Sequence, residues 1–181
     1  FIMVSCFDFS VVRAWFRPGI FFLVRLFGIS ILFTVILSPA EYLLQAFETQ
    51  QVQALLGLVG LLTVSLSPIQ FWLEQKTIEI SPLCSGLLEM ILLTSAIMAT
   101  PNLPNSKKIK GILVGVLLLY LFNLLRIFVT ILQLVHTPIE FAVLTHDVLF
   151  RGVLVLGFAA LYAGWIHFAR ITHWFRVHEI I

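Results

Sequence analysis

Charged residues and cysteines are both scarce in this chain of 181 residues. Asp, Glu, Lys and Arg make up 11% of it, hydrophobic residues make up 60%, and the mean hydropathy is +1.07. This composition excludes an ordinary soluble domain and is typical of an integral membrane protein. The length leaves room for one unit, so we expect residues 1–181 to form a single membrane domain.

The two cysteines, Cys6 and Cys84, are too few for a disulfide framework or a cysteine-based zinc site. The net charge is +2 and the basic residues are spread over several segments, so we expect no nucleic acid partner. Four further histidines lie at predicted interfaces without the spacing of metal ligands. We therefore assign no metal and no cofactor to His136, His167, His173 and His178.

Four apolar segments are long enough to cross a hydrocarbon core of about 30 Å, which takes about 20 helical residues. They are residues 20–37, 83–99, 111–135 and 148–168. A fifth run, residues 52–66, is shorter and contains Gly57 and Gly60, so a crossing, a re-entrant helix and an interfacial helix all stay open. The predicted fold is an all-α, polytopic membrane bundle with four clear transmembrane helices and this shorter helix.

Basic residues outside the apolar segments predict the orientation, because cytoplasmic loops are enriched in Lys and Arg. With both termini inside, four crossings fit if residues 52–66 do not traverse, and the polar stretch 41–53 then lies at the outer interface. Arg25 interrupts the first apolar segment and Pro39 follows it, which favours a retained anchor over a cleaved secretory signal. The residues expected on the cytoplasmic side are Arg13, Arg17, Lys107, Lys108, Lys110, Arg170 and Arg176.

Residues 76–81, Lys-Thr-Ile-Glu-Ile-Ser, alternate polar and apolar side chains with the two-residue period of a half-buried strand. Together with residues 70–73 they fit a small β-hairpin on the outer face, and they fit a plain surface loop equally well. A strand directly before Cys84 could hold an extended substrate peptide as an added strand. The substrate-binding candidates are Thr77, Ile78, Glu79 and Ile80.

Polar residues inside apolar segments are functional candidates, because an ionisable side chain in hydrocarbon costs at least about 2.5–3.5 kcal/mol. Asn123, Arg126 and Thr130 follow one another at helical spacing. A rise of about 1.5 Å per residue places Arg126 about 22 Å beyond residue 111, in the outer part of the core. Cys84 and His146 fall at the same level, so we expect these two and Arg126 to meet.

These three residue types supply the parts of an acyl-transfer centre. A thiolate is a strong nucleophile, an imidazole transfers protons near neutral pH, and a guanidinium can neutralise an oxyanion. Structural interpretations stay open beside this one. A free cysteine often only packs, a histidine can simply lie at an interface, and Arg126 could form an ion pair with Glu89 or Asp147.

Three motifs resemble the signatures of exosortases and archaeosortases. Residues 84–86, Cys-Ser-Gly, are similar to their Cys-Ser/Thr-Gly signature, and residues 123–127, Asn-Leu-Leu-Arg-Ile, match their Asn-x-x-Arg-Ile. His146 stands where their single His opens the last core helix. The order, the spacing and the membrane setting agree over roughly residues 50–165, the expected family-like core.

The resemblance implies a transpeptidase of the cell membrane whose substrates carry a C-terminal signal of a short motif, a transmembrane helix and a basic cluster. It implies that Cys84 is the nucleophile, His146 transfers protons and Arg126 stabilises the transition state. Cleavage would occur on the outer face, and the acyl group would pass to a lipid-like or surface amine acceptor. The supporting residues would be Ser85, Gly86, Glu89, Asn123 and Asp147.

Two other functions stay open. An intramembrane serine protease could use Ser85 and His146, but Leu83 occupies the first glycine position of a Gly-x-Ser-Gly motif. A non-enzymatic transporter subunit or assembly scaffold would use Arg126 in a structural ion pair. The sequence predicts no oligomeric state.

Overall fold

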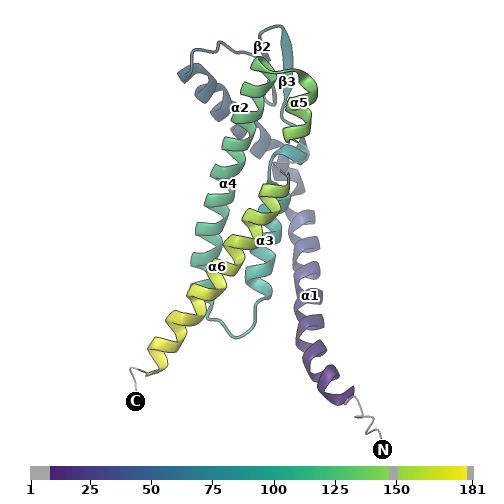
Figure 1. Ribbon diagram of the computed structural model, residues 1–181, viewed down its shortest axis with the longest axis vertical. Helices are drawn as coiled ribbons and strands as arrows, with labels where there is room; N and C mark the ends of the chain where they lie inside the picture. Colours follow the sequence, from purple (N-terminus) through teal and green to yellow (C-terminus); the bar gives the residue numbers. More distant parts are fainter. Residues whose placement is uncertain (1–8, 147–150, 179–181) are drawn as a thin grey trace, which may run out of the picture.

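The computed structural model describes residues 9–146 and 151–178 (Figure 1). In chain order its elements are α1 (Phe9–Leu37), η1 (Ser38–Ala40), α2 (Glu41–Leu58), β1 (Val64–Ser67), β2 (Gln70–Leu73), β3 (Lys76–Glu79), η2 (Pro82–Cys84), α3 (Leu87–Ala99), α4 (Asn105–His136), α5 (Ile139–Leu144) and α6 (Arg151–His178).

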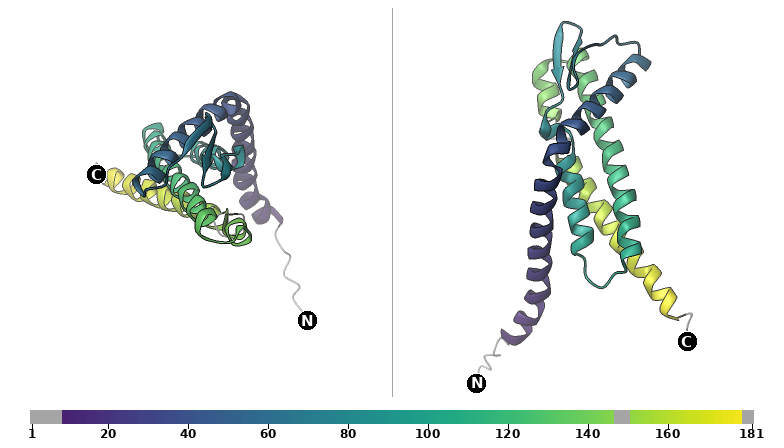
Figure 2. Two further views of the ribbon diagram at one scale, coloured as in Figure 1. Left: turned by 90° about the horizontal axis from the view of Figure 1, so that it is seen from above. Right: turned by 180° about the vertical axis from the view of Figure 1, so that it is seen from behind.

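The long helices form a bundle with a small sheet at one end. α3 packs between α1 and α4, and α6 contacts both α3 and α4. The chain changes direction between α1 and α2, so that α2 leans across the end of the bundle where the strands and α5 lie (Figure 2). The α3–α4 connection lies at the opposite end (Figure 1).

Among the described residues, three helical segments are long and apolar enough to cross a membrane: Gly19–Leu58, Asn105–His136 and Gly152–Ala169. The segment predicted at residues 83–99 forms a shorter helix, α3. Gly86 has a φ of +67°, outside the right-handed helical region, so α3 begins only at Leu87. Residues 148–150 of the last predicted segment lie outside the described residues. The number of four crossings stays a prediction.

The run of residues 52–66 does not form one helix, and whether its helical part crosses, re-enters or lies at the interface stays a prediction. α2 extends to Leu58, a turn follows with Gly60 at a φ of +84°, and Val64 opens a strand. The polar stretch 41–53 becomes most of α2, whose buried residues lie on one helical face. They are Gln45, Glu48, Thr49, Val52 and Leu56.

The predicted β-hairpin is confirmed, and a third strand extends it. β2 pairs with β3 in antiparallel register, with Leu73 opposite Lys76, and β1 pairs with the other side of β2. The two connecting residues, Glu74 and Gln75, both have positive φ. A two-residue loop with this geometry matches the twist of the flanking strands and so fixes their register.

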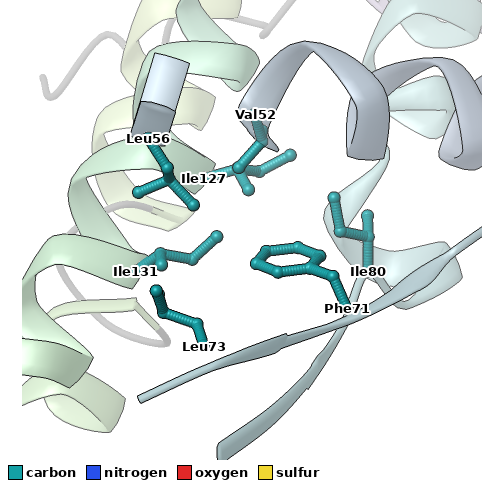
Figure 3. Packing of buried hydrophobic residues seen from close by; sticks show 7 residues of the cluster. All are labelled: Val52, Leu56, Phe71, Leu73, Ile80, Ile127 and Ile131. Atoms are coloured by element: carbon teal, nitrogen blue, oxygen red, sulfur yellow. The ribbon is translucent and has the colours of Figure 1, made fainter. Parts of the chain in front are cut away.

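An apolar cluster holds the sheet against the helices. Phe71 and Leu73 of β2 are buried, whereas Trp72 between them is exposed, as expected for a strand with one covered face. Figure 3 shows these side chains pointing toward residues of α2 and α4. The sheet is therefore fixed at the end of α4 that also carries Arg126. The buried members are Val52, Leu56, Phe71, Leu73, Ile80, Ile127 and Ile131.

Two glycines of α4 allow its neighbours to approach closely. A Cβ atom at Gly111 would overlap the Trp165 ring of α6, and one at Gly115 would lie 2.6 Å from a methyl carbon of Leu93 on α3. Small residues at such positions let membrane helices pack backbone to side chain. Trp165 also donates a hydrogen bond to the Lys107 carbonyl, which ties α6 to α4.

Replacing Gly111 by alanine should therefore destabilise the bundle. The added methyl group must displace Trp165, and overpacking of this kind costs about 1–3 kcal/mol. The matched control is Gly157→Ala on α6, where an added Cβ meets no described atom within 4 Å. Thermal unfolding in detergent should show a lower midpoint for Gly111→Ala than for Gly157→Ala, and equal midpoints would contradict this packing.

Candidate active site

The Cys84 thiol lies on the short turn η2, before α3 rather than in its first helical turn as the sequence suggested. Its Sγ is 3.3 Å from His146 Nε2 and 3.3 Å from Ser81 Oγ, which donates to it. Pro82 at the start of η2 and Gly86 after it interrupt regular helix on both sides. The thiol is half-buried and faces a histidine far away in sequence.

His146 follows α5, a short helix that the sequence analysis did not predict, and residues 147–150 lie outside the described residues. Pro138 precedes α5, and the Thr145 hydroxyl donates to the Phe141 carbonyl. The helix α5 packs against α4, which places His146 beside Arg126. How His146 relates to the start of α6 is therefore untested.

Arg126 comes from α4 and is only 2% exposed. Its Nη2 lies 3.4 Å from His146 Nε2, the same ring nitrogen that faces Cys84 Sγ. These distances bring Cys84, Arg126 and His146 together, as expected from the sequence. The thiol of Cys84 and the guanidinium of Arg126 therefore converge on Nε2 of His146.

Asn123 holds the turn that carries the thiol. Its Nδ2 donates to the Cys84 carbonyl at 2.8 Å and to Glu48 Oε1 at 3.1 Å. A Cβ atom at Gly86 would lie 3.0 Å from Asn123 Cγ, so the positive φ and the close approach both require glycine there. Asn123 and Gly86 thus act on the backbone of the Cys84 turn.

The surroundings of Cys84 favour its ionised form. Burial raises the pKa of the thiol, but the hydrogen bonds from His146 and Ser81 and the charges of His146 and Arg126 outweigh burial. The net effect lowers the Cys84 pKa from 9.0 to about 7. At neutral pH a large share of Cys84 is therefore thiolate, the nucleophilic form.

A cavity of about 220 Å³ opens beside the thiol, between β3 and the helices α4 and α5. Of the four substrate-binding candidates, Ile78, Glu79 and Ile80 line this cavity. Thr77 is exposed on β3 and does not line it. Since β3 pairs with β2 on one side only, its other edge is unpaired within the described sheet.

The supporting residues named from the sequence fall in different places. Ser85 is fully buried, and its hydroxyl donates to the Pro82 carbonyl, so it shapes the turn. Glu89 lines a different cavity, with Glu41 of α2, and the ion pair suggested between it and Arg126 is not formed. Asp147 lies outside the described residues.

Glu48 is the residue of this site that the sequence analysis missed. It is 0% exposed and contacts Asn123, although it was assigned to a polar stretch at the interface. The signal was present in the three- and four-residue spacing of Gln45, Glu48 and Val52. That spacing places Glu48 on the covered face of a helix.

The family model described as transmembrane exosortase matches residues 1–169. The chain belongs to the transmembrane exosortase family. No curated protein and no solved structure matches it. Family membership and the apolar helices together make this exosortase a multi-pass membrane protein.

Alkylation of Cys84 by iodoacetamide, followed by mass spectrometry in a Cys6→Ser background, should show a midpoint near pH 7. Reactivity follows the thiolate, so a lowered pKa extends it to lower pH. In His146→Ala the midpoint should rise toward 9, the ordinary value, because the hydrogen bond and the charge that lower the pKa are lost. A midpoint that His146→Ala leaves unchanged would contradict the contact between Sγ and Nε2.

Proposed function

We propose that this chain is a membrane-embedded cysteine transpeptidase that cleaves C-terminal sorting signals of exported proteins. Its support is the convergence of Cys84 Sγ and Arg126 Nη2 on one nitrogen of His146, at 3.3 and 3.4 Å, beside a cavity edged by β3. The substrate is cut on the outer face, and the acyl group is transferred to a lipid or surface amine acceptor.

In the first half of the reaction, His146 Nε2 accepts the Cys84 proton and Sγ attacks the scissile carbonyl carbon. Once Nε2 is protonated, it can no longer accept a hydrogen bond from Arg126 Nη2. The guanidinium donor is then available to the oxyanion that develops on the substrate. The tetrahedral intermediate collapses, the C–N bond breaks, and the proton on Nε2 passes to the leaving amine, which leaves a thioester on Cys84.

In the second half, the acceptor amine attacks the thioester and gives a proton to His146 Nε2. The C–S bond breaks, and Cys84 departs as a thiolate that its surroundings already favour. The new amide leaves the cavity, and the proton on Nε2 is available again for the thiolate. Bonds and protons balance without a cofactor or an oxidant.

The orientation proposed for the chain follows its charges. Lys107, Lys108 and Lys110 lie in the first turns of α4, at the end opposite the sheet (Figure 1). Placing them in the cytoplasm puts the sheet and Cys84 on the outer side. We propose α3 as a short fourth crossing beside the three longer helical segments, which keeps both termini cytoplasmic.

The decisive test is Cys84→Ala in cells or membranes that contain a protein with a sorting signal. Processing should fall to background because the thioester can no longer form, while the membrane level and thermal unfolding midpoint of the enzyme stay unchanged. Ser85→Ala serves as the matched comparison, since an intramembrane serine protease would lose activity through Ser85 instead. Processing that survives in Cys84→Ala would exclude the transpeptidase.

The edge of β3 is the proposed binding site for the substrate's extended motif. A photoreactive amino acid at Glu79, which is exposed and lines the cavity, should crosslink to the sorting-signal motif. The same group at Val64, exposed on the opposite edge strand β1, should not. Equal crosslinking at the two positions, or crosslinking at Val64 alone, would place the substrate elsewhere.

A further inference from the structure

Glu48 is a fully buried carboxyl group to which the proposed reaction gives no role. Its Oε1 accepts the Asn123 Nδ2 hydrogen bond at 3.1 Å. Within the described part of the chain, its Oε2 is buried without a hydrogen-bond partner. A buried carboxyl that lacks full pairing is costly, so a stabilising role in packing does not explain it.

The Asn123 amide nitrogen is shared between Glu48 and the turn of Cys84. It carries two hydrogens, and the two acceptors that receive them are Glu48 Oε1 and the Cys84 carbonyl. Two acceptors in different directions fix the plane of the amide. With only the Cys84 carbonyl left, the side chain could rotate about χ2, whose energy profile is broad.

Glu48 also determines which way the amide points. If Asn123 were flipped, its Oδ1 would face the Cys84 carbonyl and the Glu48 carboxyl, so that oxygen would oppose oxygen. An apolar residue at position 48 would leave one of the two acceptors missing and weaken this preference. The turn would then lose part of the restraint that keeps Cys84 Sγ 3.3 Å from His146 Nε2.

We propose that Glu48 is a positioning residue, which acts through Asn123 to hold the Cys84 turn against His146. This inference rests on the proposed nucleophilic role of Cys84. An acceptor oxygen at position 48, more than the charge of the side chain there, sets the reactivity of the Cys84 thiol. Among the described residues, the ionisable and charged groups around the site include Glu48 of α2, Glu79 of β3, Tyr120 and Arg126 of α4, and His146 after α5.

The experiment compares Glu48→Ala with Glu48→Gln in the Cys6→Ser background. Both variants remove the carboxyl, so a change in nearby charge is common to them, and only glutamine keeps an acceptor oxygen for Asn123. The matched control is Thr49→Ala, because Thr49 is equally buried on α2 and its hydroxyl bonds only to the Gln45 carbonyl of the same helix. The readouts are the pH midpoint of Cys84 alkylation and the thermal unfolding midpoint.

We expect the alkylation midpoint of Glu48→Ala to exceed that of Glu48→Gln by about one pH unit. Below both midpoints this shift is an approximately tenfold lower rate. Asn123→Leu should raise the midpoint as Glu48→Ala does. Thr49→Ala should leave it unchanged even if its unfolding midpoint falls. If Glu48→Ala fails to fold, Asn123→Leu against Glu48→Gln carries the same comparison.

Equal alkylation midpoints in Glu48→Ala and Glu48→Gln would overturn the positioning role. So would a shift of the same size in Thr49→Ala, which would indicate general loosening of α2. Alkylation needs no sorting-signal substrate, so these outcomes are separate from failure of the proposed function. If Cys84→Ala loses processing while Glu48→Ala and Glu48→Gln have equal alkylation midpoints, the proposed transpeptidase function holds and the positioning role of Glu48 is wrong.

Discussion

The hydrogen bonds of the Asn123 amide are the interaction on which the site depends. One nitrogen joins three elements, because Asn123 belongs to α4, Glu48 to α2 and Cys84 to the turn before α3. The same side chain would crowd a Cβ at Gly86, the residue of positive φ after which α3 begins. The position of the thiol is therefore fixed through its backbone as well as through the contacts of Sγ with Ser81 and His146.

The sequence assigned residues to the correct helix where they lie on a long apolar segment. Asn123 and Arg126 lie one helical turn apart within a regular helix, so their shared face and approximate depth follow from the rise per residue. Cys84 was expected at the same depth, but in the wrong element. The composition of residues 83–99 cannot reveal that Gly86 adopts a positive φ, since glycine is tolerated in apolar helices as well.

The remaining misses have different causes. Glu48 sits in a stretch whose polar composition suggested an interface, and only the cover of α4 turns one face of α2 into a buried one. The hairpin was predicted from the alternation of residues 76–81. β1, Val-Ser-Leu-Ser, alternates in the same way, but its residues were assigned to the apolar run 52–66. α5 is shorter than two full turns, too short for a periodic pattern to predict it.

The burial of Arg126 is the strongest physical indication of what the site does. A structural arginine at 2% exposure would be expected to bind a carboxylate, but Glu89 lines another cavity, and Glu48, the buried carboxyl near the guanidinium, accepts its hydrogen bond from Asn123 instead. The guanidinium faces the ring nitrogen that also meets the thiol. Once His146 Nε2 gains a proton, the guanidinium of Arg126 loses the hydrogen-bond acceptor that this nitrogen provided. In the proposed reaction it therefore gains most from an oxyanion formed at the same moment, which would match the arrangement to the transition state better than to the resting state.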